Sequence, residues 1–182
     1  MAKKVARRKY VDFKGRMVMI GFGSIGQGVL PLILRHIGIK PRQITIIAED
    51  DRGGLPETER YGVEFIEKRL TQANYRQMLA GRLAKGDFLV NLSVEVASTA
   101  LVELCQEKGA LYIDTCIEPW PGGYTDPNLS VSRRSNYALR ETSTTSLWMT
   151  PASPTMERPG SMMTSGMRLP KWRTSARPTA SQ

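Results

Sequence analysis

The chain has 182 residues, enough for one domain with a buried core, and its formal net charge is +9. The positive charge lies at the two ends, because residues 1–16 carry seven Lys or Arg against one Asp whereas residues 17–141 carry 14 bases against 15 acids, so the sequence disfavours nucleic-acid binding. Two cysteines, one histidine and no run near the roughly 20 apolar residues of a membrane span predict a cytoplasmic protein with no metal site, no disulfide framework and no membrane segment.

Residues 1–14 are predicted to be a basic, flexible N-terminal segment, followed by one folded domain over residues 15–141. The domain opens with Met17–Ile20, which is entirely apolar and therefore predicts a short buried strand. Ser24–His36 predicts a helix, because its apolar residues recur at four-residue steps.

Three glycines lie between this strand and this helix in the pattern G-x-G-x-x-G: Gly21, Gly23 and Gly26. In a dinucleotide-binding fold the first glycine makes a tight turn, the second lets a pyrophosphate approach the backbone, and the third lets the helix pack closely. Ser24 and Ile25 begin the helix, where free N–H groups and the helix dipole attract phosphates. A tight turn that binds nothing would use the same glycines.

A second buried strand is predicted over 44–51, and it ends in acids. Asp50 lies 24 residues past Gly26, where the dinucleotide-binding pattern has an acid that accepts hydrogen bonds from the adenosine ribose. Such an acid repels a 2′-phosphate and favours NAD over NADP, although Arg52 could reverse that preference. The same role is open to the neighbouring acids, Glu49 and Asp51.

The rest of the domain alternates strands and helices, which predicts an α/β fold with a Rossmann-like, doubly wound parallel sheet. Ligands of such sheets bind beyond the carboxyl ends of the strands. The predicted elements are a strand over 63–70, a helix capped by Thr71, a strand over 88–92, a helix over 95–109 that Gly109 ends, and a strand over 111–115.

The stretch "IDTCIEPWPGGYTD", residues 113–126, combines acids with aromatic residues beside the last predicted strand. Glu118 and Trp120 belong to it, and Glu95 follows the preceding strand at the same edge of the sheet. Carboxylates hold ammonium groups and an indole face attracts cations, so this grouping suits a cationic substrate. A polar loop whose tryptophan only covers the sheet edge is an equal alternative.

Residues 142–182 differ abruptly in composition, with 15 Ser or Thr and five Pro among 41 residues and no Val, Ile, Phe or Tyr. A segment this poor in β-branched and aromatic residues has no periodic apolar face, so we predict a disordered C-terminal tail. The change in composition is typical of a shifted reading frame, so we expect a frameshifted or truncated product.

The chain resembles the homospermidine synthases of the saccharopine dehydrogenase-like group. The resemblance covers nearly all of residues 10–141 and rests on "MVMIGFGSIGQGVLPLILRHI", "ITIIAEDDRG", "GDFLVNLSVEV", "ELCQEKGALYIDTCIEPWPGGYTDP" and "RSNYALRE". The family's chains are longer, and a second domain completes their substrate pocket and their oligomer contacts. The resemblance therefore implies the N-terminal, NAD-binding half of such an enzyme, and we expect this chain alone to be inactive.

The resemblance implies an NAD-dependent reaction in which putrescine, or a related diamine, is oxidised to an imine. The imine exchanges with a second diamine, ammonia leaves, and the returned hydride gives homospermidine. Glu118 and Glu95 are implied as catalytic residues that hold ammonium groups, with Trp120 in the substrate site. The implied cofactor site consists of Gly21, Gly23, Ser24, Ile25 and Gly26 at the pyrophosphate, Asp50 at the ribose, and Asn91 and Thr115 at the nicotinamide.

Two other functions stay open from the sequence. A saccharopine dehydrogenase-like oxidoreductase would need bases that hold substrate carboxylates, whereas residues 113–126 offer acids. A non-catalytic NAD-binding fragment would keep the glycine motif and leave these acids without a role.

Overall fold

The computed structural model describes residues 8–141, and the predicted tail over 142–182 lies outside them. Five parallel strands form one sheet in the order β5-β4-β2-β6-β7. The predicted doubly wound parallel sheet is thus confirmed. The strand order switches between β2 and β6, because β4 and β5 are added on one side of β2 and β6 and β7 on the other. The strands are β2 (Met17–Ile20), β4 (Ile44–Ala48), β5 (Glu64–Glu67), β6 (Phe88–Asn91) and β7 (Leu111–Asp114).

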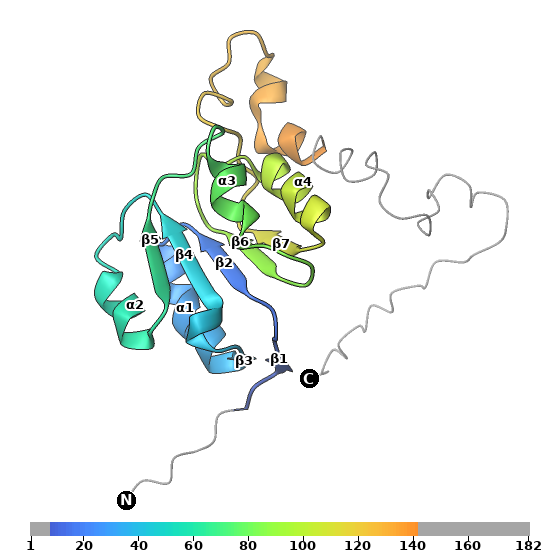
Figure 1. Cartoon of the computed structure of the whole chain (residues 1–182). Coiled ribbons are helices and arrows are strands. Elements are labelled where there is room, and N and C mark those ends of the chain that lie inside the picture. The colour runs from blue at the N-terminus through green and yellow to red at the C-terminus, as the bar shows by residue number, and fades with distance from the viewer. Residues whose placement is uncertain (1–7, 142–182) are drawn as a thin grey trace, which may run out of the picture. The chain divides into compact units, whose positions relative to one another are not determined.

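Helices cover both faces of the sheet (Figure 1). One face carries α1 (Ser24–His36) and α2 (Leu55–Tyr61), and the other carries α3 (Tyr75–Ala80) and α4 (Ser98–Lys108). Short 3-10 helices occupy Pro41–Gln43 and Val131–Arg134.

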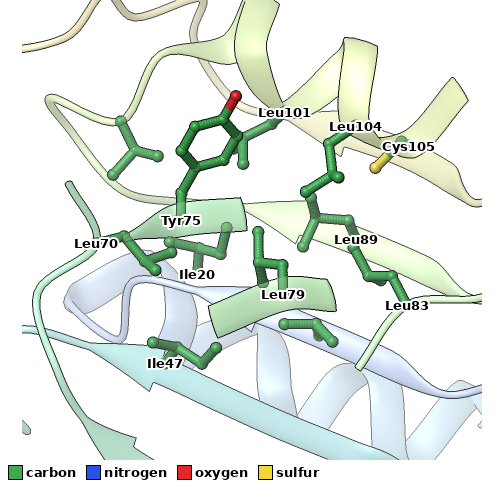
Figure 2. Packing of buried hydrophobic residues seen from close by; sticks show 12 residues of the cluster. Ile20, Ile47, Leu70, Tyr75, Leu79, Leu83, Leu89, Leu101, Leu104 and Cys105 are labelled. Carbon is green, nitrogen blue, oxygen red and sulfur yellow. The ribbon is translucent and has the colours of Figure 1, made fainter. Parts of the chain in front are cut away.

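The core has two parts, one on each face of the sheet. Beneath α3 and α4, buried side chains such as Leu79 and Leu101 meet Ile20 and Leu89 of the strands, as Figure 2 shows. On the opposite face, Leu30 of α1 packs on a second group from β2, β4 and β6. All four residues of β2 are buried, as the uninterrupted apolar run predicts for a central strand.

A small parallel pair, β1 (Val11–Asp12) with β3 (Ile37–Gly38), adjoins the end of α1. The Tyr10 amide donates to the His36 carbonyl at 2.8 Å and the Phe13 amide donates to the Gly38 carbonyl at 3.1 Å. Both bonds tie part of residues 1–14, for which the sequence predicted flexibility, to the end of α1 and to β3. Two-residue strands give no periodic pattern from which this pairing could be predicted.

Two helices begin later than the sequence predicted. Asn74 Oδ1 accepts from the Thr71 amide at 2.8 Å, so a turn precedes α3 and the helix starts at Tyr75 rather than at Thr71. Glu95 has φ +61°, which a right-handed helix cannot contain, so α4 starts at Ser98. The predicted end of α4 is confirmed, because Gly109 caps it at φ 67°.

An ion pair between the half-exposed Arg16 and the buried Asp87 joins the amino ends of β2 and β6, opposite the predicted ligand edge. Asp87 is 5% exposed and accepts from the Arg16 amide at 2.7 Å, from the Arg16 guanidinium at 2.7 and 3.0 Å, and from the Ala84 amide at 2.8 Å. Burial alone would raise the pKa of this carboxyl, but the hydrogen bonds outweigh it and hold the pKa below its usual value.

Candidate cofactor and substrate site

The three glycines of the motif have separate structural reasons. Gly21 has φ +87°, and a Cβ there would lie 2.9 Å from the Leu92 carbonyl carbon and from the Ser93 amide nitrogen. A Cβ on Gly26 would lie 2.9 Å from the Gly21 carbonyl oxygen, whereas one on Gly23 would meet nothing within 4 Å. Backbone packing therefore requires two of the glycines, and the third faces the open space that a pyrophosphate needs.

The amino end of α1 offers uncapped amides beside that space. Gly23 is the N-cap residue, no side chain caps the helix, and its first turn holds no acid. Ser24 and Ile25 are exposed at this end. Free N–H groups at the positive end of a 13-residue helix form an anion-binding site, so the local structure suits a phosphate group.

A groove of about 410 Å³ runs in front of this helix end, between the glycine loop, the end of β4 and the turn after β6. Glu49, Asp50 and Arg52 line it on the β4 side, and Ser93 lines it on the β6 side. Gln27 fixes its outer wall, because its Nε2 donates to the carbonyls of Phe22 at 3.1 Å and Arg52 at 3.2 Å. Sequence reasoning missed Gln27, since only the fold brings these loops together.

The three acids after β4 differ in their contacts. The Asp51 carboxylate accepts from the amides of Gly53 at 3.2 Å and Leu55 at 3.3 Å, so it holds the turn before α2. Asp50 lies 2.7 Å from Arg52 Nε. Only Glu49 and Asp50 of the three line the groove, which favours these two for the ribose role that the sequence predicted.

Asn91 is 1% exposed, and its amide is bonded within the protein. Its Oδ1 accepts from the Ser93 amide at 3.2 Å and from Ser93 Oγ at 2.6 Å, while its Nδ2 donates to the Tyr112 hydroxyl at 3.4 Å. Burial raises the pKa of Tyr112, whose hydroxyl donates to Asp114 at 3.0 Å. Asn91 thus positions the Ser93 turn of the groove, and Thr115 is exposed just past the end of β7.

The three residues predicted to meet the substrate lie together. Glu95, Glu118 and Trp120 all line one pocket of about 230 Å³, with Tyr124. The Trp120 ring also packs on Tyr75 of α3 at 5.4 Å between centroids. The indole therefore anchors the loop to the core and also lines the pocket, whereas its role toward a cationic substrate stays a prediction.

Ser98, at the start of α4, holds the backbone of Glu118. The Ser98 amide donates to the Glu118 carbonyl at 2.9 Å, and the Glu118 amide donates to Ser98 Oγ at 3.1 Å. Ser98 is 1% exposed, so this pairing is shielded from water. The sequence analysis missed it because it placed Ser98 inside a helix rather than at its first turn.

Arg69 lies between the cofactor groove and the substrate pocket. Its guanidinium is 3.4 Å from Glu49, which lines the groove, and 3.0 Å from Glu95, which lines the pocket. A small cavity lined by Gly21, Arg69 and both acids shares Gly21 and Glu49 with the groove and Glu95 with the pocket. The loop after β5 thus supplies a cation that the sequence analysis did not identify.

Cys116 lies beside Glu118 and is exposed. Partial burial of its sulfur and the neighbouring Glu118 raise the pKa of the thiol, which keeps it protonated and a poor nucleophile. Over residues 8–141 no three His, Cys, Asp or Glu side chains group as a metal site would require, and none of the helices there could span a bilayer.

A family model matches residues 17–146, and it describes the saccharopine dehydrogenase NADP-binding domain. The chain belongs to this family. The match contains the glycine loop, the acids after β4 and the pocket with Glu118.

Curated relatives of this saccharopine dehydrogenase-like chain are named homospermidine synthase. The protein from Blastochloris viridis is 48% identical over 136 residues, and the one from Mesorhizobium japonicum is 44% identical over 135 residues. These matches cover 73% and 72% of this chain but 28% of each relative, so the chain spans just over a quarter of their length.

A solved structure has the same fold as this family member. It is the homospermidine synthase of Legionella pneumophila in complex with NAD. The two proteins are 39% identical with a TM-score of 0.65, and the match covers 75% of this chain and 27% of the solved chain. The comparisons confirm the resemblance to homospermidine synthases that the sequence motifs indicated.

Proposed function

We propose that this chain forms the NAD site and one wall of the diamine site of a homospermidine synthase. The observation that carries the proposal is the sequence of shared lining residues along the carboxyl edge of the sheet. A small cavity shares Glu49 with the groove at the glycine loop and Glu95 with the pocket at Glu118 and Trp120, and Arg69 pairs with both acids.

The cofactor half of the proposal rests on the open space at Gly23 and the uncapped end of α1, which fit a pyrophosphate. NAD, when bound, would supply a reversible acceptor for the hydride that leaves the amine-bearing carbon of putrescine. In the net reaction an aminobutyl group passes from one putrescine to a second, and ammonia is released. Glu49 or Asp50 would accept hydrogen bonds from the ribose, and Ser93 would border the nicotinamide half of the groove, with Asn91 behind it. Thr115 follows β7 at the same edge and stays a proposed nicotinamide neighbour.

The substrate half rests on the charge of the pocket. Its lining includes the carboxylates of Glu95 and Glu118 and no Lys or Arg, which favours a diammonium substrate over the carboxylates of an amino acid. Glu118 would hold one ammonium group, and Trp120 would face it through a cation–π contact. Glu95 would hold the second ammonium group once Arg69 releases it.

Calorimetric titration of the 182-residue chain with NAD tests the cofactor half. Gly23→Ala should weaken NAD binding about tenfold, because the added methyl group enters the pyrophosphate space. Gly28→Ala is the matched control, since a Cβ there also meets nothing within 4 Å but lies inside α1. Absence of NAD binding by the unmodified chain would overturn the cofactor site.

Titration with putrescine in saturating NAD tests the substrate half. Glu118→Gln should weaken putrescine binding about tenfold while NAD binding is retained, because one ion pair is lost. Glu59→Gln on α2 is the charge-matched control. Equal putrescine affinity in both variants would remove Glu118 from the site.

A further inference from the structure

Arg69 occupies the carboxylate that the proposed diamine site would use for a second ammonium group. Its Nη2 lies 3.0 Å from Glu95 Oε2, and its Nη1 lies 3.4 Å from Glu49 Oε1. Glu95 lines the pocket with Glu118, whereas Glu49 lines the cofactor groove. A guanidinium and an ammonium group both donate charged hydrogen bonds to carboxylates, so Arg69 and a diamine would compete for Glu95.

The backbone on both sides of Arg69 is held in place. The Lys68 amide donates to the Ala48 carbonyl at 2.6 Å, and the Arg69 carbonyl accepts from Asn74 Nδ2 at 3.0 Å. Leu70, the next residue, is 5% exposed and belongs to the core beneath α3 and α4. The Arg69 side chain is 50% exposed, so a change of rotamer is enough to shift the guanidinium from one of its two acids onto the other.

Both ion pairs of Arg69 are exposed enough for water to weaken them. The side chains of Glu49 and Glu95 are 61% and 56% exposed. An ion pair with this exposure shifts an equilibrium by at most about fivefold. A competing cation can therefore displace Arg69 from Glu95, and Glu49 stays within reach to hold the displaced guanidinium.

The attachment of each cation decides which amines can displace Arg69. The guanidinium is tethered to the chain beside Glu95, so its effective concentration there is high. An ammonium group reaches a comparable effective concentration only when another part of its own molecule is already bound. A diamine held at one end by Glu118 meets this condition, whereas a monoamine or a free ammonium ion does not.

We propose that Arg69 is a specificity-determining residue that reserves Glu95 for the second ammonium group of a diamine bound at Glu118. When a diamine binds, the guanidinium passes to Glu49. With a monoamine or with no amine, it stays on Glu95 and keeps that carboxylate from other cations. This inference rests on the proposed diamine site and adds the selection between amines of one and of two charges.

Calorimetric titration of the 182-residue chain with putrescine tests this role, without NAD so that Glu49 is open to receive the guanidinium. Arg69→Gln should strengthen putrescine binding about threefold to fivefold, because the tethered competitor is removed. Arg42→Gln is the charge-matched control and should leave the affinity unchanged, since Arg42 is exposed in the 3-10 helix before the amino end of β4.

A double variant separates competition at Glu95 from a general repulsion between Arg69 and the amine. Glu95→Gln removes the contested carboxylate, so adding Arg69→Gln to it should leave the putrescine affinity unchanged. A gain in affinity that persists in the double variant would mean that Arg69 acts by its charge alone, and would overturn the proposal.

The position of Arg69 itself is read by NMR spectroscopy of the chain with isotope-labelled arginine. The Nε–H signal of Arg69, assigned by its loss in Arg69→Gln, should shift when putrescine is added and stay in place when butylamine is added. An equal shift with both amines would overturn the selection between them.

Glu118→Gln in the same titration separates this inference from the proposed function. If Glu118→Gln weakens putrescine binding but Arg69→Gln leaves it unchanged, the diamine site stands and the role of Arg69 is overturned. If neither the unmodified chain nor Arg69→Gln binds putrescine, or if neither substitution changes the affinity, both proposals are overturned.

Discussion

Ser98 and Glu118 exchange two hydrogen bonds although Ser98 begins α4 and Glu118 lies in the loop after β7. The Ser98 amide donates to the Glu118 carbonyl, and Ser98 Oγ accepts from the Glu118 amide. Ser98 is thereby a positioning residue for the carboxylate that is proposed to hold the diamine.

Ser98→Ala should lower the free energy of unfolding by about 1–2 kcal/mol, because the Glu118 amide loses its buried acceptor. Urea denaturation monitored by circular dichroism measures this change. Ser132→Ala is the control, since Ser132 is exposed and, among residues 8–141, its hydroxyl bonds the hydroxyl of the exposed Ser130. Equal stability of the two variants would mean that water replaces Ser98 Oγ.

Asp50→Asn should weaken NAD binding and strengthen NADP binding, because it frees Arg52 Nε, now 2.7 Å from the Asp50 carboxylate, to meet a 2′-phosphate. We expect the NAD/NADP affinity ratio to fall about tenfold or more at low salt. Calorimetric titration with both cofactors measures the ratio.

Two controls assign this change in preference. Asp51→Asn should leave the ratio unchanged, because Asp51 caps the turn before α2 and does not line the groove. Adding Arg52→Ala to Asp50→Asn should abolish the gain in NADP binding. An unchanged ratio in Asp50→Asn would move the ribose role to Glu49.

Asp87→Asn should lower the free energy of unfolding by about 2–3 kcal/mol at neutral pH. We expect no larger loss because the Arg16 side chain is 49% exposed, so water screens the ion pair. The carboxyl pKa is lower in the folded chain than in the unfolded chain, where it is about 3.9. The stabilisation is therefore complete above about pH 4 and is lost as the pH falls through the folded-state pKa. Melting temperatures of both proteins should converge on acidification, and a constant difference down to the lowest pH would contradict this origin.

The 182-residue chain alone should make no homospermidine from putrescine and NAD. The Glu95 side chain is 56% exposed, so water screens its attraction for an ammonium group. A site open to water also positions the substrate poorly, and correct positioning can be worth roughly 7–11 kcal/mol of the reaction barrier. Chromatographic analysis of the products measures turnover. Homospermidine formed at a rate above that of the Glu118→Gln variant would contradict the expectation.

Local patterns predicted β2 and α1 at their observed bounds, because an all-apolar run and a four-residue apolar period specify each element without long-range information. The glycine loop between them was predicted for the same reason, because its motif is a local pattern of residue types. The start of α4 was predicted wrongly, because the left-handed backbone of Glu95 has no signature in residue type.

Contacts between distant segments could not be read from the sequence. Arg69 meets Glu49 and Glu95 only because three strands end at one edge of the sheet, and a single Arg in a loop carries no signal of that convergence. The exposure of Leu111 and Ile113 on β7, 56% and 52%, was likewise hidden, since an exposed and a buried strand face share the same alternation.

The Trp120 indole, which packs on Tyr75, is a fluorophore in the lining of the proposed substrate pocket. The indole lines the pocket and rests on a side chain of the core, so its emission depends both on occupancy and on folding. The chain has three tryptophans, and replacing Trp148 and Trp172 by Phe would leave Trp120 as the single emitter. Quenching by a diamine and the spectral shift on denaturation could then be followed in one optical experiment without an added dye.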